Sequence, residues 1–451
     1  MYKPYIKPVF TASPDLKMPE PHISRLVLFA VRMLGRIYLF FALGIARIVI
    51  RNGRNLYEAY KRALEDKSRC ILAFRHPNGG EAQILLWFIV YILRRKAWFQ
   101  GIKLIKRPLV SFVYGFEVAR WGGGIARWVM PGLGSMPVHH SKVDSASMTR
   151  IFKTITDGPY PLAIAPEGQV SYTTESIPRL EQGTVRIGFQ AAERIEKNNK
   201  NCPVEILPIS IHFRYGSMGR MSLNKLLRKI EKYTGFKNND NAGFSERLRR
   251  ARDYILEQNE KRYEITPGQD QSFSERVDVI MEAALTKAEQ ILGIKQISSE
   301  LVDRLYNIRQ ICWDRVVIPG IMSLDHLTLL ERAIMDLNAG EAWHASRHME
   351  LVDFVWYFRI PVPSEDAPLY IKIEYAQNLW DFASRTMGGA YSNRVLNVHP
   401  KRVVIQIGSI INLSERLPDY RENKKEAIAN AMKDLEKAYL DCIDCASEYQ
   451  I

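Results

Sequence analysis

Cysteine is scarce in this sequence. The 451 residues include five cysteines, at positions 70, 202, 312, 442 and 445. An odd number at scattered positions excludes a fold held together by a disulfide framework, and it favours a reducing compartment. Cys442 and Cys445 form a CxxC pair, but one pair alone is a poor zinc signal, and we expect two half-buried thiols on a helix. The sequence therefore predicts no metal site and no bound cofactor.

Acidic residues are outnumbered by basic ones, 49 to 63, which gives a formal net charge of +14. Such a chain attracts polyanions, either nucleic acids or anionic lipid surfaces. No nucleic-acid module is recognisable, and no platform of interleaved aromatic and basic residues is present in the sequence. We expect basic runs such as residues 247–250 to be solvated helix faces, with membrane lipids as partners and no nucleic acid. Nucleic-acid binding remains an alternative.

Residues 1–55 have the composition of a membrane-interface segment. The first twenty residues are polar and contain prolines, unlike a signal peptide. The apolar residues 23–50 are interrupted by four arginines, at positions 25, 32, 36 and 47. A helix would gather these arginines within about 60° of its circumference. The longest uncharged run within this segment has ten residues, whereas a spanning helix needs about twenty.

We therefore predict that this segment is one helix in the bilayer interface at the cytoplasmic face, with its basic stripe toward the phosphates. Two alternatives stay open. One is a spanning helix with snorkelling arginines, and the other is a core helix whose basic stripe faces water.

Short apolar runs alternate with amphipathic segments over residues 56–215. The pattern predicts strands at 70–74, 98–105, 162–165 and 204–213, and helices at 56–65, 81–93 and 179–196. Strands that alternate with helices indicate an α/β unit.

The pattern changes after residue 215. Residues 216–399 are mostly helical and rich in charge, and Ser272 with Glu275 fits a capping box that opens a helix. A strand at 402–413 and an amphipathic helix at 422–448 follow. We divide the chain into a membrane-interface segment (1–55), an α/β domain (56–215), a helical insertion or accessory domain (216–399), and a final strand and helix that return to the α/β domain (400–451).

His76 and Glu81 form a constellation suited to proton transfer. The histidine follows an apolar strand and the glutamate opens the next helix, in a His-x4-Glu spacing. The turn between them can fold the carboxylate onto one imidazole nitrogen, which leaves the other nitrogen free to accept a proton. With such a base, a substrate hydroxyl can attack an acyl carbonyl without a nucleophilic serine or cysteine.

The spacing alone is a weak signal. It recurs at His139 with Asp144 and at His348 with Asp353. His344 lies one helical turn before His348, which is also a spacing of metal ligands. The choice among the three histidine–acid pairs depends on what surrounds them.

The surroundings of the first pair resemble the glycerolipid acyltransferases, the family of the 1-acylglycerol-3-phosphate acyltransferases. The matched segments, in order, are residues 76–81 (HPNGGE), 134–140 (GSMPVHH), 165–171 (APEGQVS), 178–192 (a helix with a glycine), 207–209 (LPI) and 406–408 (QIG). The resemblance covers residues 25–215 and part of 400–451. It implies an acyltransferase-like mixed sheet flanked by helices, with an N-terminal membrane helix, His76 as the base and Glu81 as the carboxylate that orients it.

The resemblance also implies an acceptor site. Its implied substrate-binding residues are Pro166, Glu167, Gly168, Gln169, His140 and Arg179. Glu167 would position the acceptor or hold the loop, and Gly168 would permit close backbone approach. Val170 and His140 stand where the family has arginines that look like phosphate ligands. These departures favour a lysolipid with another head group, a glycolipid or another alcohol over glycerol phosphate or lysophosphatidic acid.

Two further departures lie next to the base. Glu81 stands where the family has aspartate, and Arg75 stands where it commonly has asparagine. We predict an acyltransferase of phospholipid metabolism that moves a fatty acyl group from acyl-CoA or acyl-carrier protein to a hydroxyl of a lysophospholipid or other glycerolipid-type acceptor. The alternative is a catalytically weak lipid-binding or scaffold protein on the same fold.

Overall fold

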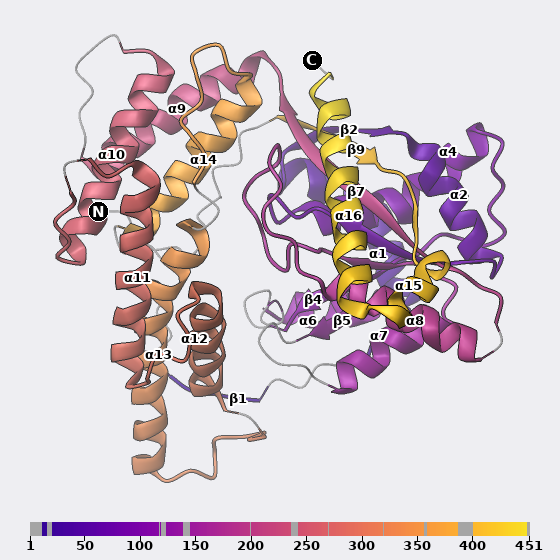
Figure 1. Ribbon diagram of the computed structural model, residues 1–451, viewed down its shortest axis with the longest axis horizontal. Coiled ribbons are helices and arrows are strands. Elements are labelled where there is room, and N and C mark those ends of the chain that lie inside the picture. The colour runs from indigo at the N-terminus through magenta and orange to yellow at the C-terminus, as the bar shows by residue number, and fades with distance from the viewer. Residues whose placement is uncertain are drawn as a thin grey trace. The chain divides into compact units, whose positions relative to one another are not determined.

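The computed structural model describes residues 11–15, 20–116, 118, 123–138, 145–198, 200–235, 242–268, 270–318, 320–355, 359–386 and 400–448. The chain folds into two compact units, drawn in Figure 1. The first, here called the α/β unit, consists of Met18–Gly216 and His399–Ile451. The second, here called the helical unit, consists of Met1–Lys17 and Ser217–Val398.

One mixed sheet organises the described part of the α/β unit. Its strands are β2 (Ile45–Arg51), β3 (Arg69–Phe74), β4 (Ser111–Gly115), β5 (Met136–Val138), β6 (Leu162–Ile164), β7 (Val204–Tyr215), β9 (Lys401–Ile407) and β10 (Ile411–Asn412). Their order is β2-β9-β7-β3-β6-β4-β5, with β10 beside β7. The strands from β7 to β5 in this order are mutually parallel, whereas β9 and β10 run antiparallel to β7. The predicted α/β class with a mixed sheet is confirmed.

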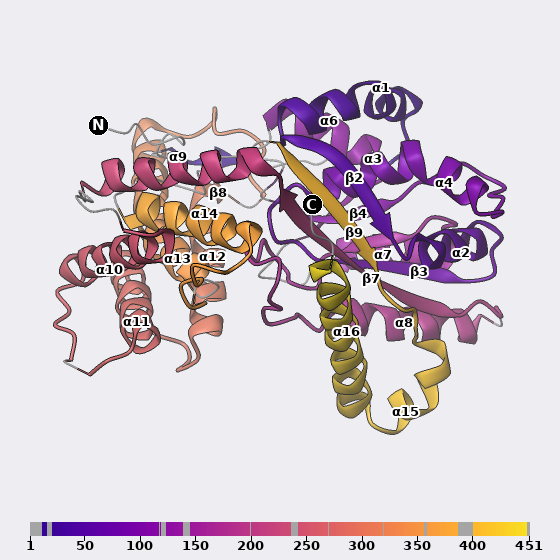
Figure 2. The same ribbon diagram turned by 90° about the horizontal axis from the view of Figure 1, so that it is seen from above.

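Helices cover both faces of this sheet, as Figure 2 shows. One side carries α1 (Arg25–Phe41), α3 (Glu81–Trp87), α4 (Arg94–Phe99) and α6 (Gly123–Gly132), and a π-helical segment, η1 (Phe88–Leu93), joins α3 to α4. The other side carries α8 (Gly183–Lys197), α15 (Leu417–Glu422) and α16 (Lys424–Ser447). The unit also contains α2 (Gly53–Leu64) and α7 (Ser145–Asp157). β3 and β7 are buried along their whole length, as expected for central strands covered on both faces.

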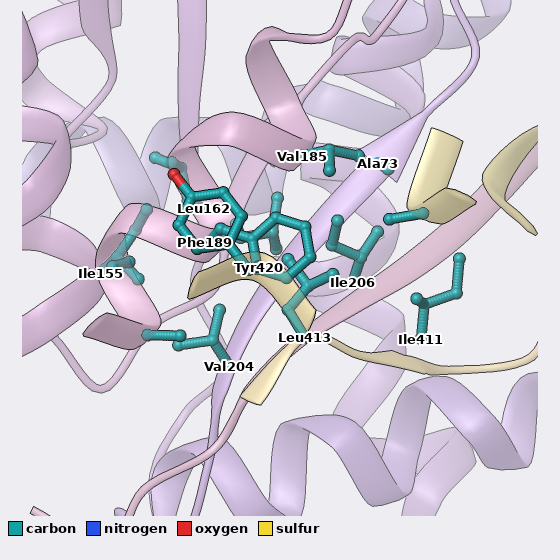
Figure 3. Packing of buried hydrophobic residues seen from close by; sticks show 14 of the residues in the cluster. Ala73, Ile155, Leu162, Val185, Phe189, Val204, Ile206, Ile411, Leu413 and Tyr420 are labelled. Atoms are coloured by element: carbon teal, nitrogen blue, oxygen red, sulfur yellow. The ribbon is translucent and has the colours of Figure 1, made fainter. Parts of the chain in front are cut away.

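A hydrophobic core fills the space between the sheet and α8, α15 and α16. Phe189 of α8 is fully buried, and its ring stacks on that of Tyr420 with the centroids 4.4 Å apart. Figure 3 shows these two rings near Leu162 and Leu413, whose side chains belong to the same core. The packed rings fasten α15, near the carboxyl end of the chain, to a helix more than 200 residues earlier.

Truncating this ring tests the core. Phe189→Ala is expected to lower the free energy of unfolding of the α/β unit by about 3–5 kcal/mol, because a large cavity remains. Phe99→Ala removes the same side chain where it is 68% exposed, and its effect should stay within about 0.5 kcal/mol. Denaturant titration of both variants makes the comparison. Equal losses would show that Phe189 does not anchor α15.

The helical unit is built from six described helices and one short strand pair. The helices are α9 (Ser217–Thr234), α10 (Phe244–Arg262), α11 (Phe273–Leu292), α12 (Leu301–Val316), α13 (Leu329–Val355) and α14 (Leu369–Thr386). The strands β1 (Ser13–Pro14) and β8 (Val317–Ile318) pair in parallel. The capping box predicted at the start of α11 is confirmed, because the side chain and backbone of Ser272 exchange hydrogen bonds with those of Glu275.

The N-terminal apolar segment is helical over a shorter range than predicted. α1 ends at Phe41, and Gly44, with φ of +68°, leads the chain into β2, which pairs in parallel with β9. Arg47 therefore lies on a strand, and Arg36 donates hydrogen bonds of 2.7 Å to the carbonyl groups of the first two residues of β2. The predicted single helix with four arginines in one stripe is wrong, because the β-branched residues after Gly44 meet a strand partner. Among the described helices, none has both the length and the apolarity required to cross a membrane.

The strand predicted at residues 98–105 is wrong as well. Residues 98 and 99 end α4, which continues the helix that begins at Glu81 through η1. The next strand is β4, which begins only at Ser111.

Candidate active site

The site lies where neighbouring parallel strands end. β3 pairs in parallel with β6 on one side and with β7 on the other. The carboxyl ends of parallel strands meet at one edge of a sheet, which is where α/β proteins bind their ligands. His76 follows β3 and Glu167 follows β6, so the fold brings these two residues to the same edge.

His76 is held by the carboxylate of Glu81. Its Nδ1 lies 2.7 Å from Glu81 Oε2, and the backbone N–H of Gly79 donates to the same oxygen over 2.8 Å. Gly79 has φ of +93°, a conformation that favours glycine, and it lets the turn fold back onto the imidazole. The Glu81 side chain is 0% exposed and the His76 side chain 22%. Because an ionised carboxylate only accepts hydrogen bonds, Nδ1 carries the proton and Nε2 can act as an acceptor.

The surroundings of His76 raise its pKa above the ordinary value. Burial alone lowers this pKa, but the hydrogen bond to Glu81 and the negative charges of Glu81 and Glu167 together outweigh burial. The imidazole is therefore a stronger base than a solvated histidine. It loses its capacity to accept a proton as the pH falls through the raised pKa.

Glu167 lies in the Pro-Glu-Gly turn (residues 166–168). Its Oε1 accepts from Nε of Arg75 over 2.9 Å, and its Oε2 accepts from the backbone N–H of His76 over 2.7 Å. Gly168 has φ of +71° and closes the turn with a hydrogen bond of 3.1 Å from its N–H to the carbonyl of Ala165. Glu167 is 2% exposed, so protein groups surround its carboxylate.

Other residues predicted for substrate binding lie around this turn or away from it. Pro166 is buried, and its carbonyl accepts from the N–H of Glu181 over 2.6 Å. Gln169 is half-buried next to the turn, and Arg179 is exposed. His140 lies outside the described residues, together with the rest of residues 139–144.

Val170 lies against the turn that carries His76. A Cβ placed on Gly79 would lie 3.9 Å from Cγ2 of Val170. An apolar side chain therefore occupies the place next to this turn, at the sequence position where the resembled family carries an arginine.

Two buried groups of the site were not predicted from the sequence. Arg75 was noted only as a departure from the family pattern, yet it binds Glu167 directly. On β7, Arg214 donates to Glu175 over 2.7 Å, and Nδ1 of His212 lies 3.2 Å from the same carboxylate oxygen. Burial lowers the pKa of His212, which favours its neutral form. The signal was present, because two polar residues with one residue between them interrupt an apolar strand on one face.

Of the other two histidine–acid pairs, the one that the structure describes, His348 with Asp353, does not form a comparable site. His348 Nδ1 bonds to the hydroxyl of Tyr263 at 2.8 Å, and burial lowers the pKa of His348 to about 3. Asp353 pairs with Arg309 at 3.0 Å. The pair His139 and Asp144 lies outside the described residues. Within the described ranges no cluster of three or more histidine, cysteine, aspartate or glutamate side chains could hold a metal ion. All five cysteines are free, Cys442 buried and Cys445 exposed.

Comparison with known proteins adds no relative. No protein-family model, no curated protein and no solved structure matches this chain. The functional argument therefore depends on the geometry of the site and on the sequence motifs that form it.

Proposed function

We propose that this protein is an acyltransferase that moves a fatty acyl group from acyl-CoA or acyl-carrier protein to a hydroxyl of a lysophospholipid or other glycerolipid-type acceptor. One observation carries the proposal. The imidazole of His76 is oriented by Glu81 through a hydrogen bond of 2.7 Å, beside the Pro-Glu-Gly turn and at the carboxyl ends of two parallel strands. The finer fold proposed with it is an acyltransferase-like α/β domain associated with the cytoplasmic face of a membrane.

The reaction follows from the free imidazole nitrogen. Nε2 of His76 takes the proton of the acceptor hydroxyl. At the same time the hydroxyl oxygen attacks the thioester carbon and forms the new C–O bond. The tetrahedral intermediate then breaks its C–S bond, and the imidazolium returns the proton to the departing thiolate. Glu81 stabilises the imidazolium that forms between these two steps. No covalent acyl–enzyme is needed.

The pH dependence follows from the base. Only the neutral imidazole accepts the proton, so the rate is expected to fall as the pH falls through the raised pKa of His76. Glu81→Gln removes the negative charge that raises this pKa and leaves the imidazolium a neutral hydrogen-bond partner. The acid limb of the rate profile should then move to lower pH, and the maximal rate should drop by about 10- to 100-fold because the imidazolium loses its charged partner. A profile of kcat/KM against pH for both proteins measures this. An unmoved acid limb would mean that another group is the base.

The acceptor class follows from the residues near the turn. Val170 cannot donate a hydrogen bond to a phosphate, and it occupies the side of the turn next to Gly79. This supports an acceptor whose hydroxyl is presented without a phosphate at that position, such as a lysolipid with another head group, a glycolipid or another alcohol.

An exposed apolar face on α1 supports work at a lipid surface. Large apolar side chains that are 46% to 76% exposed follow the helix, at Leu26, Phe29, Met33, Leu34, Ile37, Tyr38, Phe40 and Phe41. Tyr91 of η1, Trp98 and Phe99 of α4, and Ile105 after α4 add further exposed apolar side chains. Figure 2 shows α4 on the same side of the sheet as α1. We call these twelve residues the apolar face. Aromatic and aliphatic side chains of this kind are typical of segments that lie in a bilayer interface.

The charge around the apolar face is basic. Neither residues 23–57 nor residues 82–116 contain an acidic residue, and each stretch carries six arginines or lysines. Burial and the positive charge of Arg107, which follows α4, lower the pKa of Arg32 on α1. Such a surface complements anionic lipid head groups. Leu43, just after α1, lies next to Gly80, so the end of this helix adjoins the turn that holds His76.

The proposal is tested by turnover. The purified protein, with vesicles present, is supplied with acyl-CoA or acyl-carrier protein loaded with a fatty acid, and with a panel of lysolipids, glycolipids and glycerol phosphate. The release of thiol and the formation of an ester, followed by mass spectrometry, would identify donor and acceptor. Binding of lysolipid without turnover from either donor would reject the proposal and favour the scaffold alternative.

A further inference from the structure

We propose that Arg75 and Glu167 are a positioning pair that sets the orientation of His76, and that Glu167 is not a ligand of the acceptor. This inference rests on the proposed function, since it assigns a role within the same site.

Arg75 is fixed at the centre of the loop that follows β6. Its guanidinium is 1% exposed and donates to Glu167 through Nε. Nη1 donates to the carbonyl of Thr174 over 2.7 Å, and Nη2 donates to the carbonyls of Thr173 over 2.8 Å and Ser176 over 2.6 Å. A planar fork with five donors suits this arrangement, whereas a lysine has one nitrogen and could not reach all four acceptors at once.

Glu167 connects the fixed guanidinium of Arg75 to the backbone of His76. One carboxylate oxygen binds Arg75 and the other binds the N–H of His76 over 2.7 Å, so both oxygens are engaged. The carbonyl of His76 accepts from the N–H of Ser171 over 3.0 Å. Both peptide groups of the histidine are therefore held by the loop that Arg75 fastens. Because this carboxylate is only 2% exposed and both its oxygens face protein donors, an acceptor hydroxyl has little access to it.

The loop that contains Glu167 has little regular structure to hold it in place. Between β6 and α8 the chain runs through residues 165–182 without regular structure, so few backbone hydrogen bonds hold it. A mobile loop would let the imidazole turn away from the acceptor, and small errors in position are costly in catalysis. The buried ion pair between Arg75 and Glu167 holds the loop where backbone hydrogen bonds of a helix or strand are absent.

The test uses Glu167→Gln, which keeps the shape of the side chain and an acceptor for Arg75 but cannot accept from the N–H of His76 with its amide nitrogen. We expect kcat to fall by about 10- to 100-fold, with KM for the acceptor unchanged within about twofold. The acid limb of the rate profile should move to lower pH, because the charge of Glu167 helps to raise the pKa of His76. A higher KM with unchanged kcat and pH profile would identify Glu167 as an acceptor ligand and overturn the proposal.

Two further variants separate positioning from folding. Arg75→Lys keeps the positive charge that balances the Glu167 carboxylate, but it loses the planar guanidinium with its several donors. It should lower kcat without raising KM. Glu205→Gln removes a different buried partner of an arginine, since Glu205 pairs with Arg62 at 2.9 Å, and it should leave kcat, KM and the pH profile unchanged. Equal losses in Arg75→Lys and Glu205→Gln would show that the effect is general destabilisation.

A measurement without turnover separates this inference from the proposed function. NMR titration of the His76 imidazole should give a lower pKa in Glu167→Gln than in the natural protein, and no change in Glu205→Gln. If the natural protein shows no turnover but this titration difference is found, the proposed function fails while the coupling of Glu167 to His76 stands. If turnover occurs but the titration does not change, the positioning role fails alone.

Discussion

Replacement of His76 by alanine is expected to lower the rate of acyl transfer by about 10²- to 10⁴-fold. The imidazole is the group whose free nitrogen can take the acceptor proton, and general base catalysis contributes on this scale. The rate that remains would come from bound substrates alone. The assay is ester formation from a labelled acyl thioester under saturating acceptor, so that a change in binding does not hide the change in chemistry.

A matched substitution in the helical unit controls for this result. His348→Ala removes a histidine of the same His-x4-acid spacing, but this imidazole is hydrogen-bonded to Tyr263 and is kept neutral by burial. Its loss should leave the rate within about twofold, provided the variant folds as judged by circular dichroism. A rate that survives in His76→Ala and disappears in His348→Ala would move the reaction centre out of the α/β unit.

The paired histidine and glutamate could be predicted because their relation is local. Four residues separate them, residues 70–74 before them form an apolar run, and an acidic residue at the start of a helix is favoured there by the helix dipole. Glu167 was grouped with them through the ordered motifs of the resembled family, and the structure shows why the two segments lie together. Both strands that precede these residues are short, buried and parallel, and their ends must meet.

The role of Arg75 could not be predicted, because it depends on the path of a loop. Three of its four acceptors are carbonyl groups about 100 residues further along the chain, and carbonyl groups carry no sequence signal. The error at β2 has a related cause. The same residues have an apolar pattern that suits a helix, and only pairing with β9, about 350 residues away, decides for a strand. A helical pattern can be recognised within a short segment. The partner of a strand can lie hundreds of residues away, so the segment alone does not reveal it.

Acidic substitutions in the apolar face should abolish binding to anionic vesicles. Phe29→Asp combined with Met33→Asp places two carboxylates on α1 where both side chains are more than half exposed. Each large apolar side chain that enters the bilayer interface contributes about 1.5–3 kcal/mol, so losing two should weaken binding by about 10³-fold. Co-sedimentation with phosphatidylglycerol-containing vesicles measures this. The turnover of a soluble short-chain acceptor should change little, since such an acceptor reaches the site without the vesicle surface.

The helical unit offers a control of the same chemistry. Leu330 and Ile334 lie four residues apart on α13, as Phe29 and Met33 do on α1, and they are also more than half exposed. Leu330→Asp with Ile334→Asp should leave vesicle binding unchanged, because acidic residues interrupt this part of α13. Equal losses in both double variants would mean that any exposed apolar pair binds vesicles. If the α1 variant instead changed the oligomeric state in ultracentrifugation without vesicles, the apolar face would be an interface between two copies of the chain. Selective loss at α1, stronger for anionic than for neutral vesicles, is the outcome that a basic lipid-facing surface requires.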